Sequence, residues 1–274
     1  MTLGVRLAIG WLMLVIVCAA LADWIPFVKD PNYLYGFWGD APRSGGPTRE
    51  FWLGTDASSR DTLARLVYGA RVSTFIAVIA VGSGFAAGGL LGTYIGFVRG
   101  KRETAAMALI DVILAFPPVV LVLVTVAVTR QRNLLVVSGL LGLAAIPAYT
   151  RLARANALVV TNREYVRAAS AIGTKQSRIL RREIIPNVAP SLVTYSLSAA
   201  AFVVTLESSL AFIGFGVASR LPSWGRMMLL ARADIRVTVW PMVYPAVTLV
   251  LTILSLNIIG DWLRERNATR ASML

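Results

Sequence analysis

The chain alternates long apolar runs with short polar segments. A helix that crosses a lipid bilayer needs about 20 mostly apolar residues. Six segments meet this requirement: residues 7–24, 73–97, 105–128, 134–149, 188–212 and 239–259. The fourth is short by hydropathy, and we expect it to continue as helix toward residue 154. Runs of this length are typical of membrane helices rather than barrel strands, which predicts an all-α membrane protein with six transmembrane helices.

The composition favours the same class of protein. Of the 274 residues, 57% are hydrophobic and 15% charged, and the mean hydropathy is +0.68. Average soluble domains are about a quarter charged. The net charge of +13 is typical of a membrane protein whose basic loops face anionic lipid and protein partners. Binding of nucleic acid is the rival interpretation of the charge, and the hydrophobicity argues against it.

Lysine and arginine in short loops predict the orientation in the membrane. Basic residues gather between the second and third spans, between the fourth and fifth, and after the sixth. With six spans, these loops and both termini lie on one side, which we expect to be the cytoplasm. The bias is incomplete, because the other side also carries Arg130, Arg132, Arg220, Arg226, Arg232 and Arg236.

The first apolar segment has features of a signal peptide. Arg6 precedes it, and it ends in "AALA" at residues 19–22. Its length and the five spans that follow favour a retained helix over residues 1–24, with cleavage as the alternative. Either way the orientation of the remaining chain is unchanged.

Several classes of catalytic site are excluded by residue content. The sequence contains no histidine and a single cysteine, Cys18. It therefore has no Ser-His triad, no His-containing metalloprotease motif, no intrachain disulfide and no thiolate metal site. It also lacks the Gly-x4-Gly-Lys-Ser/Thr loop that binds nucleotide phosphates. We expect no catalytic residue, metal site or cofactor in this chain.

Glycines recur at a spacing of four in the second span. Small residues at this spacing form a groove in which another helix can approach closely. We expect tight packing within the helix bundle, with a moving helix interface as the alternative. The residues are Gly84, Gly88, Gly92 and Gly96.

Two prolines and two acids interrupt the apolar spans. Pro117 and Pro118 remove backbone donors and should kink the third span, as a static bend or as an element that lines or gates a cavity. Asp111 and Glu207 lie inside spans, where charge is costly. Each can belong to a translocation pathway or proton relay, or can be a buried polar contact that fixes helix register. Asp111 lies near enough to the cytoplasmic end to reach interfacial water or an arginine.

A basic island lies between the fourth and fifth spans, "TNREYVRAASAIGTKQSRILRREIIPN" at residues 161–187. Thr161 and Glu164 form a Thr-x-x-Glu capping box that predicts a helix starting near residue 162. Gly173 suits a left-handed helix stop, Thr174 can cap a second helix over residues 175–185, and Pro186 should end it. The island is thus two short amphipathic helices that either contact another protein or lie on anionic lipid.

The island resembles the cytoplasmic EAA loop of bacterial ABC import permeases. Ala168, Ala169, Gly173 and Pro186 fall at the spacing of that pattern. Arg167 stands where the general pattern has Glu, and the form "EYVRAA" is usual in the branch that imports peptides. Glu183 and Ile185 depart from the pattern near its end. The resemblance assigns an ATPase-coupling loop over residues 161–186, with Glu164, Arg167, Ala168, Ala169, Gly173, Arg178 and Pro186.

Other segments are similar to the C-type permease of dipeptide and oligopeptide importers. They are "WLGTDASSRDTLARLVYGARVS", "LESSLAFIGFG", "PSWGRMM" and "NIIGDWLRE". Ser59 replaces a glycine that is usual in the first of them. The likeness covers most of the chain from residue 52 onward.

The resemblance implies a type I ABC importer permease fold with six transmembrane helices and cytoplasmic coupling helices. It implies a multi-pass protein of the bacterial cytoplasmic membrane, in contact with membrane lipid. Its expected partners are a B-type permease, two ATPase subunits that bind ATP and Mg, and an extracytoplasmic substrate-binding protein. The expected parts are a first helix (1–24), an extracytoplasmic loop (25–70), the permease domain (71–261) and a cytoplasmic tail (262–274).

We therefore expect a non-enzymatic permease subunit that imports di- or oligopeptides with energy from partner subunits. The same role for another cargo, such as a nickel chelate, haem or a sugar, is the first alternative. A secondary transporter that uses Asp111 and Glu207 as a proton relay is the second.

Overall fold

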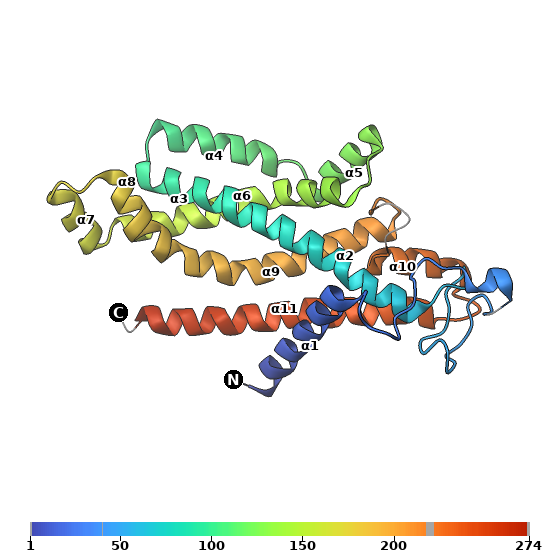
Figure 1. The fold of residues 1–274 in the computed structure, drawn as a ribbon. Helices are drawn as coiled ribbons and strands as arrows, with labels where there is room; N and C mark the ends of the chain where they lie inside the picture. Colours follow the sequence, from blue (N-terminus) through green and yellow to red (C-terminus); the bar gives the residue numbers. More distant parts are fainter. Residues whose placement is uncertain (1, 40, 218–221, 273–274) are drawn as a thin grey trace. The chain divides into compact units, whose positions relative to one another are not determined.

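The computed structural model describes residues 2–39, 41–217 and 222–272, and Arg220 lies outside them. The described residues form helices and connecting segments, with one isolated bridge between Thr55 and Asp61. The α-helices are α1 (Leu3–Leu21), α2 (Thr62–Ser83), α3 (Gly89–Val98), α4 (Lys101–Leu114), α5 (Pro118–Thr129), α6 (Leu134–Thr161), α7 (Glu164–Ala171), α8 (Gln176–Ile179), α9 (Ile185–Phe212), α10 (Trp224–Ala231) and α11 (Trp240–Ser272) (Figure 1).

Among the described residues, five helical stretches are long and apolar enough to cross a membrane: Leu3–Leu21, Thr62–Val98, Leu134–Thr161, Gln176–Phe212 and Trp240–Asn267. The helices α4 and α5 make a sixth candidate when counted as one bent span. The predicted all-α membrane fold is confirmed. The helices extend beyond most of the apolar runs, because polar residues at the ends of a span continue the helix outside the hydrocarbon layer.

The third span is two helices rather than one kinked helix. α4 ends at Leu114, α5 begins at Pro118, and the two are bent by 72°. Pro118 occupies the first turn of α5, where a missing N–H has no consequence. Pro117 in turn disfavours a helical conformation for Phe116 before it. The proline pair therefore breaks the helix.

Two wide helical turns are set into the long spans. The π-helical segment η2 (Gly84–Gly88) joins α2 to α3, and η3 (Leu180–Ile184) joins α8 to α9. The prediction that Pro186 ends the helix is wrong, because α9 runs through Pro186 to Phe212. The π turn before Pro186 changes the hydrogen-bond register, so the ring and its missing donor are accommodated.

The chain forms two compact units, and several long helices contribute to both. The first unit comprises Met1–Val78, Leu123–Ser138 and Ala201–Ile258. Its core contains Val15, Ala19, Ala70, Ala77, Val204, Trp224 and Met227. Trp224 is buried, and its indole N–H donates to the Leu66 carbonyl at 3.1 Å. Gly69 faces this indole, where an added Cβ would lie 2.9 Å from Trp224 Cδ1.

The first unit also contains the loop between α1 and α2. Lys29 lies 3.9 Å from the centre of the Phe51 ring and forms a 2.8 Å ion pair with Glu50. The short 3-10 helix η1 (Tyr35–Trp38) lies in this loop. Ring contacts join Tyr35 to Phe51 and to Tyr33, so aromatic packing fixes part of the loop.

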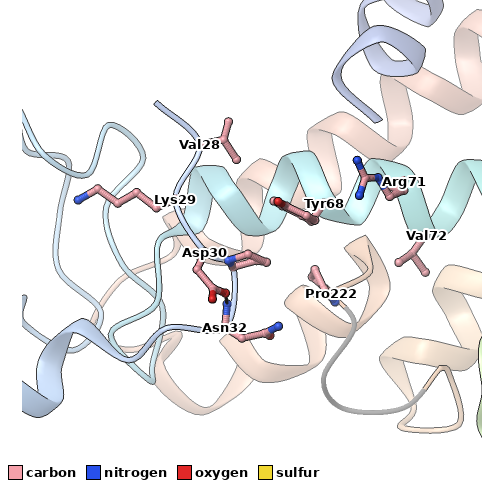
Figure 2. Close-up of a pocket in the computed structure, with 9 residues that line it drawn as sticks. Val28, Lys29, Asp30, Asn32, Tyr68, Arg71, Val72 and Pro222 are labelled. Carbon is pink, nitrogen blue, oxygen red and sulfur yellow. Dashed lines mark hydrogen bonds between the residues drawn. The ribbon is translucent and has the colours of Figure 1, made fainter. Parts of the chain in front are cut away.

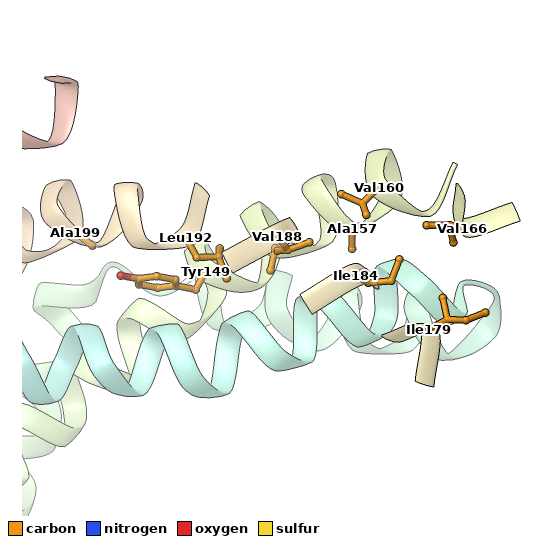
Figure 3. Packing of buried hydrophobic residues seen from close by; sticks show 10 residues of the cluster. Tyr149, Ala157, Val160, Val166, Ile179, Ile184, Val188, Leu192 and Ala199 are labelled. Carbon is orange, nitrogen blue, oxygen red and sulfur yellow. The ribbon is translucent and has the colours of Figure 1, made fainter. Parts of the chain in front are cut away.

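The second unit comprises Ile79–Val122, Gly139–Ala200 and Ile259–Leu274. Its core contains Tyr149, Ala153, Ala157, Val160, Val166, Ile179, Ile184, Val188, Leu192 and Ala199. These residues come from α6, from α9 and from the segment between them (Figure 3). The Tyr149 hydroxyl is bonded to Ser196 Oγ at 2.8 Å, which places one polar contact in this apolar core.

Candidate functional site

The basic island folds as a helical hairpin, the α7–α8 hairpin, made of α7, the turn after it and α8. Gly173 has φ +78°, in the left-handed region. The Thr174 N–H donates to the Ala169 carbonyl and the Gly173 N–H to the Ser170 carbonyl. This pair of bonds is the Schellman arrangement, which satisfies carbonyl groups at a helix end. The turn therefore depends on the conformation of one glycine.

The predicted capping of the hairpin is wrong at both helix starts. Thr161 is the last residue of α6, and its hydroxyl donates to the Ala157 carbonyl at 2.7 Å. That back-bond competes with a role as cap. α7 starts at Glu164 after Arg163, and α8 starts after Lys175 rather than Thr174, in both cases without a side-chain cap bond.

Three buried side chains anchor the hairpin to the second unit. Val166 on α7 is 2% exposed, Ile179 on α8 is 1% exposed, and Ile184 is fully buried. All three belong to the core that includes Val160 and Val188 (Figure 3). Each Å² of apolar surface removed from water contributes about 25 cal/mol of stabilising free energy. These contacts therefore hold the hairpin in a fixed position on the core.

The other face of the hairpin is exposed. Among the predicted coupling residues, Ala169 is half-buried against the core, and Glu164, Arg167, Ala168, Gly173, Arg178 and Pro186 are exposed. Ile172 is 83% exposed beside the turn, and Tyr165 is 42% exposed. Sequence reasoning missed these two as surface residues, because Ile172 follows the apolar spacing although α7 has already ended there. Exposed apolar side chains in a segment rich in basic residues are suited to contact with another protein.

Ion pairs join α4 to α6 next to the hairpin. Arg154 Nε donates to Glu103 Oε1 at 2.6 Å. Arg151 Nη2 donates to Asp111 Oδ1 at 2.6 Å, and both of these side chains are more than half exposed. Asp111 therefore reaches an arginine of the neighbouring helix α6.

The glycines at residues 84, 88, 92 and 96 face α6. A Cβ added at Gly88 would lie 2.5 Å from the Ile146 carbonyl oxygen, and one at Gly96 would lie 2.8 Å from the Arg154 carbonyl oxygen. Gly84 meets Tyr149, and Gly92 meets the Thr150 carbonyl oxygen. The absence of side chains brings the two helix backbones into direct contact.

Glu207 lies fully buried in the first unit. Its Oε2 accepts hydrogen bonds from Ser73 Oγ at 3.2 Å and from Ser208 Oγ at 3.3 Å, and its Oε1 has no partner. The carboxyl group joins α9 to α2. Glu207 belongs to the first unit and Asp111 to the second.

A pocket of about 530 Å³ opens beside the loop of the first unit, lined by residues that include Asp30, Asn32, Tyr68, Arg71 and Pro222 (Figure 2). Its polar groups are largely paired. Arg71 forms a 2.9 Å ion pair with Asp23, and the hydrogen bond from Tyr68 is the main cause that lowers the pKa of the Asp23 carboxyl. Lys29 points away from Tyr68 and Arg71 (Figure 2).

Most of the chain matches one family of membrane transport components. Residues 88–272 match the family described as binding-protein-dependent transport system inner membrane component. The chain belongs to this family. Its relatives include the glutathione transport system permease protein GsiD of Escherichia coli O1:K1, 33% identical over 258 residues, which cover 93% of this chain and 82% of the relative. The GsiD protein of Pectobacterium atrosepticum is 30% identical over 263 residues, which cover 95% and 85%.

A solved structure shows the same fold. A chain of the MetNI methionine ABC transporter, in an inward-facing conformation, superposes with a TM-score of 0.61 and 19% identity, over 73% of this chain and 95% of that one. The family match and the relatives of 30% identity or more show that the chain is a multi-pass inner-membrane subunit of an ABC importer. It is not catalytic and carries no cofactor, and it works with ATPase and binding-protein partners. The expected permease function is confirmed, and the secondary transporter is set aside.

Proposed function

We propose that this permease imports short peptides, with ATP hydrolysis on partner subunits coupled to transport through the α7–α8 hairpin. The proposed cargo rests on the likeness to glutathione permeases along nearly the whole chain. Glutathione is a tripeptide. The nickel chelates, haem and sugars considered above have no comparable support.

The hairpin is the contact with the ATPase in this proposal. Its buried residues Val166, Ile179 and Ile184 pack in the core of the second unit, and its exposed surface carries Ile172 and Tyr165. A hairpin packed in this way transmits a displacement imposed by the ATPase to the helices that it contacts. Closure of the ATPase dimer would then drive rigid-body motion of the permease.

The break at Pro117–Pro118 is the gating element in this proposal. α4 and α5 meet there at 72°, and helix breaks in transporters serve as bending points beside a substrate path. Glu207 holds register between α9 and α2, and Asp111 pairs with Arg151. We assign both acids a positioning role at the edge of the pathway, and the glycines of α2–α3 the packing of the moving helices.

The assembly follows from the count of coupling hairpins. One permease supplies one hairpin, so two permeases are needed for two ATPases. We propose a B-type permease as the partner, both termini in the cytoplasm, and the loop of residues 25–70 on the side of the binding protein. In this division the permease domain spans residues 71–261, preceded by the first helix (1–24) and followed by the tail (262–274).

The test is uptake by the complete transporter. Right-side-out vesicles containing the permease pair, the ATPases and the binding protein should accumulate a labelled tripeptide when ATP is enclosed. A variant complex with Ile172→Asp should assemble yet lose ATP-dependent uptake. Uptake of a sugar or a nickel chelate without any peptide uptake would overturn the proposed cargo.

A further inference from the structure

A second pocket, of about 560 Å³, opens in the second unit and is lined by residues of α6, α9 and α11 and by Arg163 just after α6. Its volume falls in the range of roughly 300–1,000 Å³ that small-molecule sites occupy. Side chains three or four residues apart share one face of a helix. This spacing relates Asn156 to Val160 on α6 and Asn187 to Ser191 on α9. The faces of two long helices therefore build most of the pocket.

The pocket lies at the ends of apolar spans. The stretch able to cross the membrane ends at Thr161 in α6 and at Asn267 in α11. The α7–α8 hairpin begins directly after Arg163. In the proposed orientation these ends are cytoplasmic, at the level of the lipid headgroups. Val159, one of the lining residues, is 63% exposed, so the pocket is open at its edge.

Two arginines give the pocket a positive charge. Arg163 is exposed, and among the described residues no ion pair joins it to an acid. Arg264 contacts Asp261 on the same helix at 3.2 Å, but both side chains are more than half exposed, and such pairs contribute little. None of the described residues that line the pocket is acidic. The pocket therefore favours an anion.

The rest of the lining combines amide groups with an apolar wall. Asn156 and Asn187 each donate one amide N–H to a carbonyl of their own helix, at 2.8 Å and 2.6 Å, and Asn267 donates one to Thr194 Oγ1 at 2.8 Å. An asparagine side chain has a second N–H and an oxygen acceptor, which suit hydroxyl groups. Leu152 and Val160 supply apolar surface beside them.

We infer that this pocket binds the headgroup of an anionic phospholipid of the phosphatidylglycerol class. The phosphate would lie against Arg163 and Arg264, the glycerol hydroxyls against the asparagines, and the ester-linked chains along the apolar wall. Basic pockets between transmembrane helices on the cytoplasmic side typically bind such headgroups. Free phosphate would satisfy the arginines but leave the apolar wall uncovered, so the lipid is the better fit. Because α7 follows Arg163, the bound lipid would contact the base of the coupling hairpin.

The experiment uses the complete transporter in vesicles of phosphatidylcholine with a minor share of phosphatidylglycerol. Val159 is replaced by the photoreactive residue p-benzoylphenylalanine, and the lipids that become attached on illumination are identified by mass spectrometry. Phosphatidylglycerol should be enriched severalfold among them over its share in the vesicle. Arg163→Gln and Arg264→Gln should each lower this enrichment, by up to about fivefold, since one basic side chain near the membrane surface contributes about that factor.

Lys101→Gln is the matched control. Lys101 is exposed in the same unit and starts α4, outside the pocket, so its loss should leave the enrichment unchanged. A share of phosphatidylglycerol equal to that of the vesicle, or an equal loss in all three variants, would overturn the site. Loss of the lipid adducts on addition of inorganic phosphate would assign the pocket to the free ion instead. Attachment to a partner subunit in place of lipid would show that protein covers the pocket. None of these outcomes depends on the cargo.

Discussion

At the scale of single residues, Gly173 decides where the hairpin points. Its φ of +78° lies in the left-handed region, and no other atom lies within 4 Å of a Cβ added there. The free-energy cost of a substitution at Gly173 therefore comes from backbone strain and not from steric overlap. For a β-branched residue the strain is about 1–2 kcal/mol, enough to shift the turn.

We expect Gly173→Val to uncouple transport from ATP hydrolysis. The complex should still assemble, because Val166, Ile179 and Ile184 remain buried, but ATP hydrolysis stimulated by loaded binding protein should fall severalfold. Gly173→Asn is the control, because asparagine tolerates the left-handed conformation and should keep most of the stimulation. Normal stimulation in the valine variant would exclude a coupling role for this turn.

At the scale of elements, the contact between α2–α3 and α6 rests on glycine. The added Cβ of Gly88→Ala would lie 2.5 Å from the Ile146 carbonyl oxygen and 2.8 Å from Tyr149 Cβ. Neither the carbonyl nor a Cβ can move without its helix. Overpacking of this kind destabilises by about 1–3 kcal/mol.

We expect Gly88→Ala to lower the midpoint of thermal unfolding of the purified complex by several degrees. Gly82→Ala is its matched control in the preceding turns of the same span, because no atom lies within 4 Å of a Cβ there. It should leave the midpoint unchanged or raise it slightly, since alanine favours helix. Equal midpoints for the two variants would show that the close contact between α2–α3 and α6 does not contribute to the stability of the complex.

The elements also show what the sequence could predict. The spans could be predicted because apolar runs of about 20 residues are typical of transmembrane helices. The turn at Gly173 could be predicted because it depends on the backbone conformation of a single residue. The predicted capping box is wrong because the Thr161 hydroxyl donates to the Ala157 carbonyl within α6 instead. The predicted helix end at Pro186 is wrong because the π turn η3 before it changes the hydrogen-bond register. No local sequence pattern signalled that turn.

At the scale of the whole molecule, the orientation in the membrane can be tested with two exposed serines. Ser177 lies on the hairpin, and Ser58 lies in the loop before α2. In a Cys18→Ala background, an impermeant thiol reagent applied to spheroplasts should label Ser58→Cys and spare Ser177→Cys. Disruption of the membrane should then expose the second position. The reverse pattern in intact spheroplasts would invert the topology.

The last prediction concerns the second permease. Two ATPases need two coupling hairpins, and a homodimer would supply them by two-fold symmetry. The C-type character of the "LGTD" segment instead favours a pair of different permeases, in which the B-type chain supplies the second hairpin. Expressed alone, this chain should then show neither transport nor ATP hydrolysis. Purified through a tag from native membranes in mild detergent, it should bring with it a second permease in equal amount together with two ATPase chains. A complex that imports cargo with this chain as its sole permease would refute the heterodimer, since both hairpins would then come from copies of one sequence.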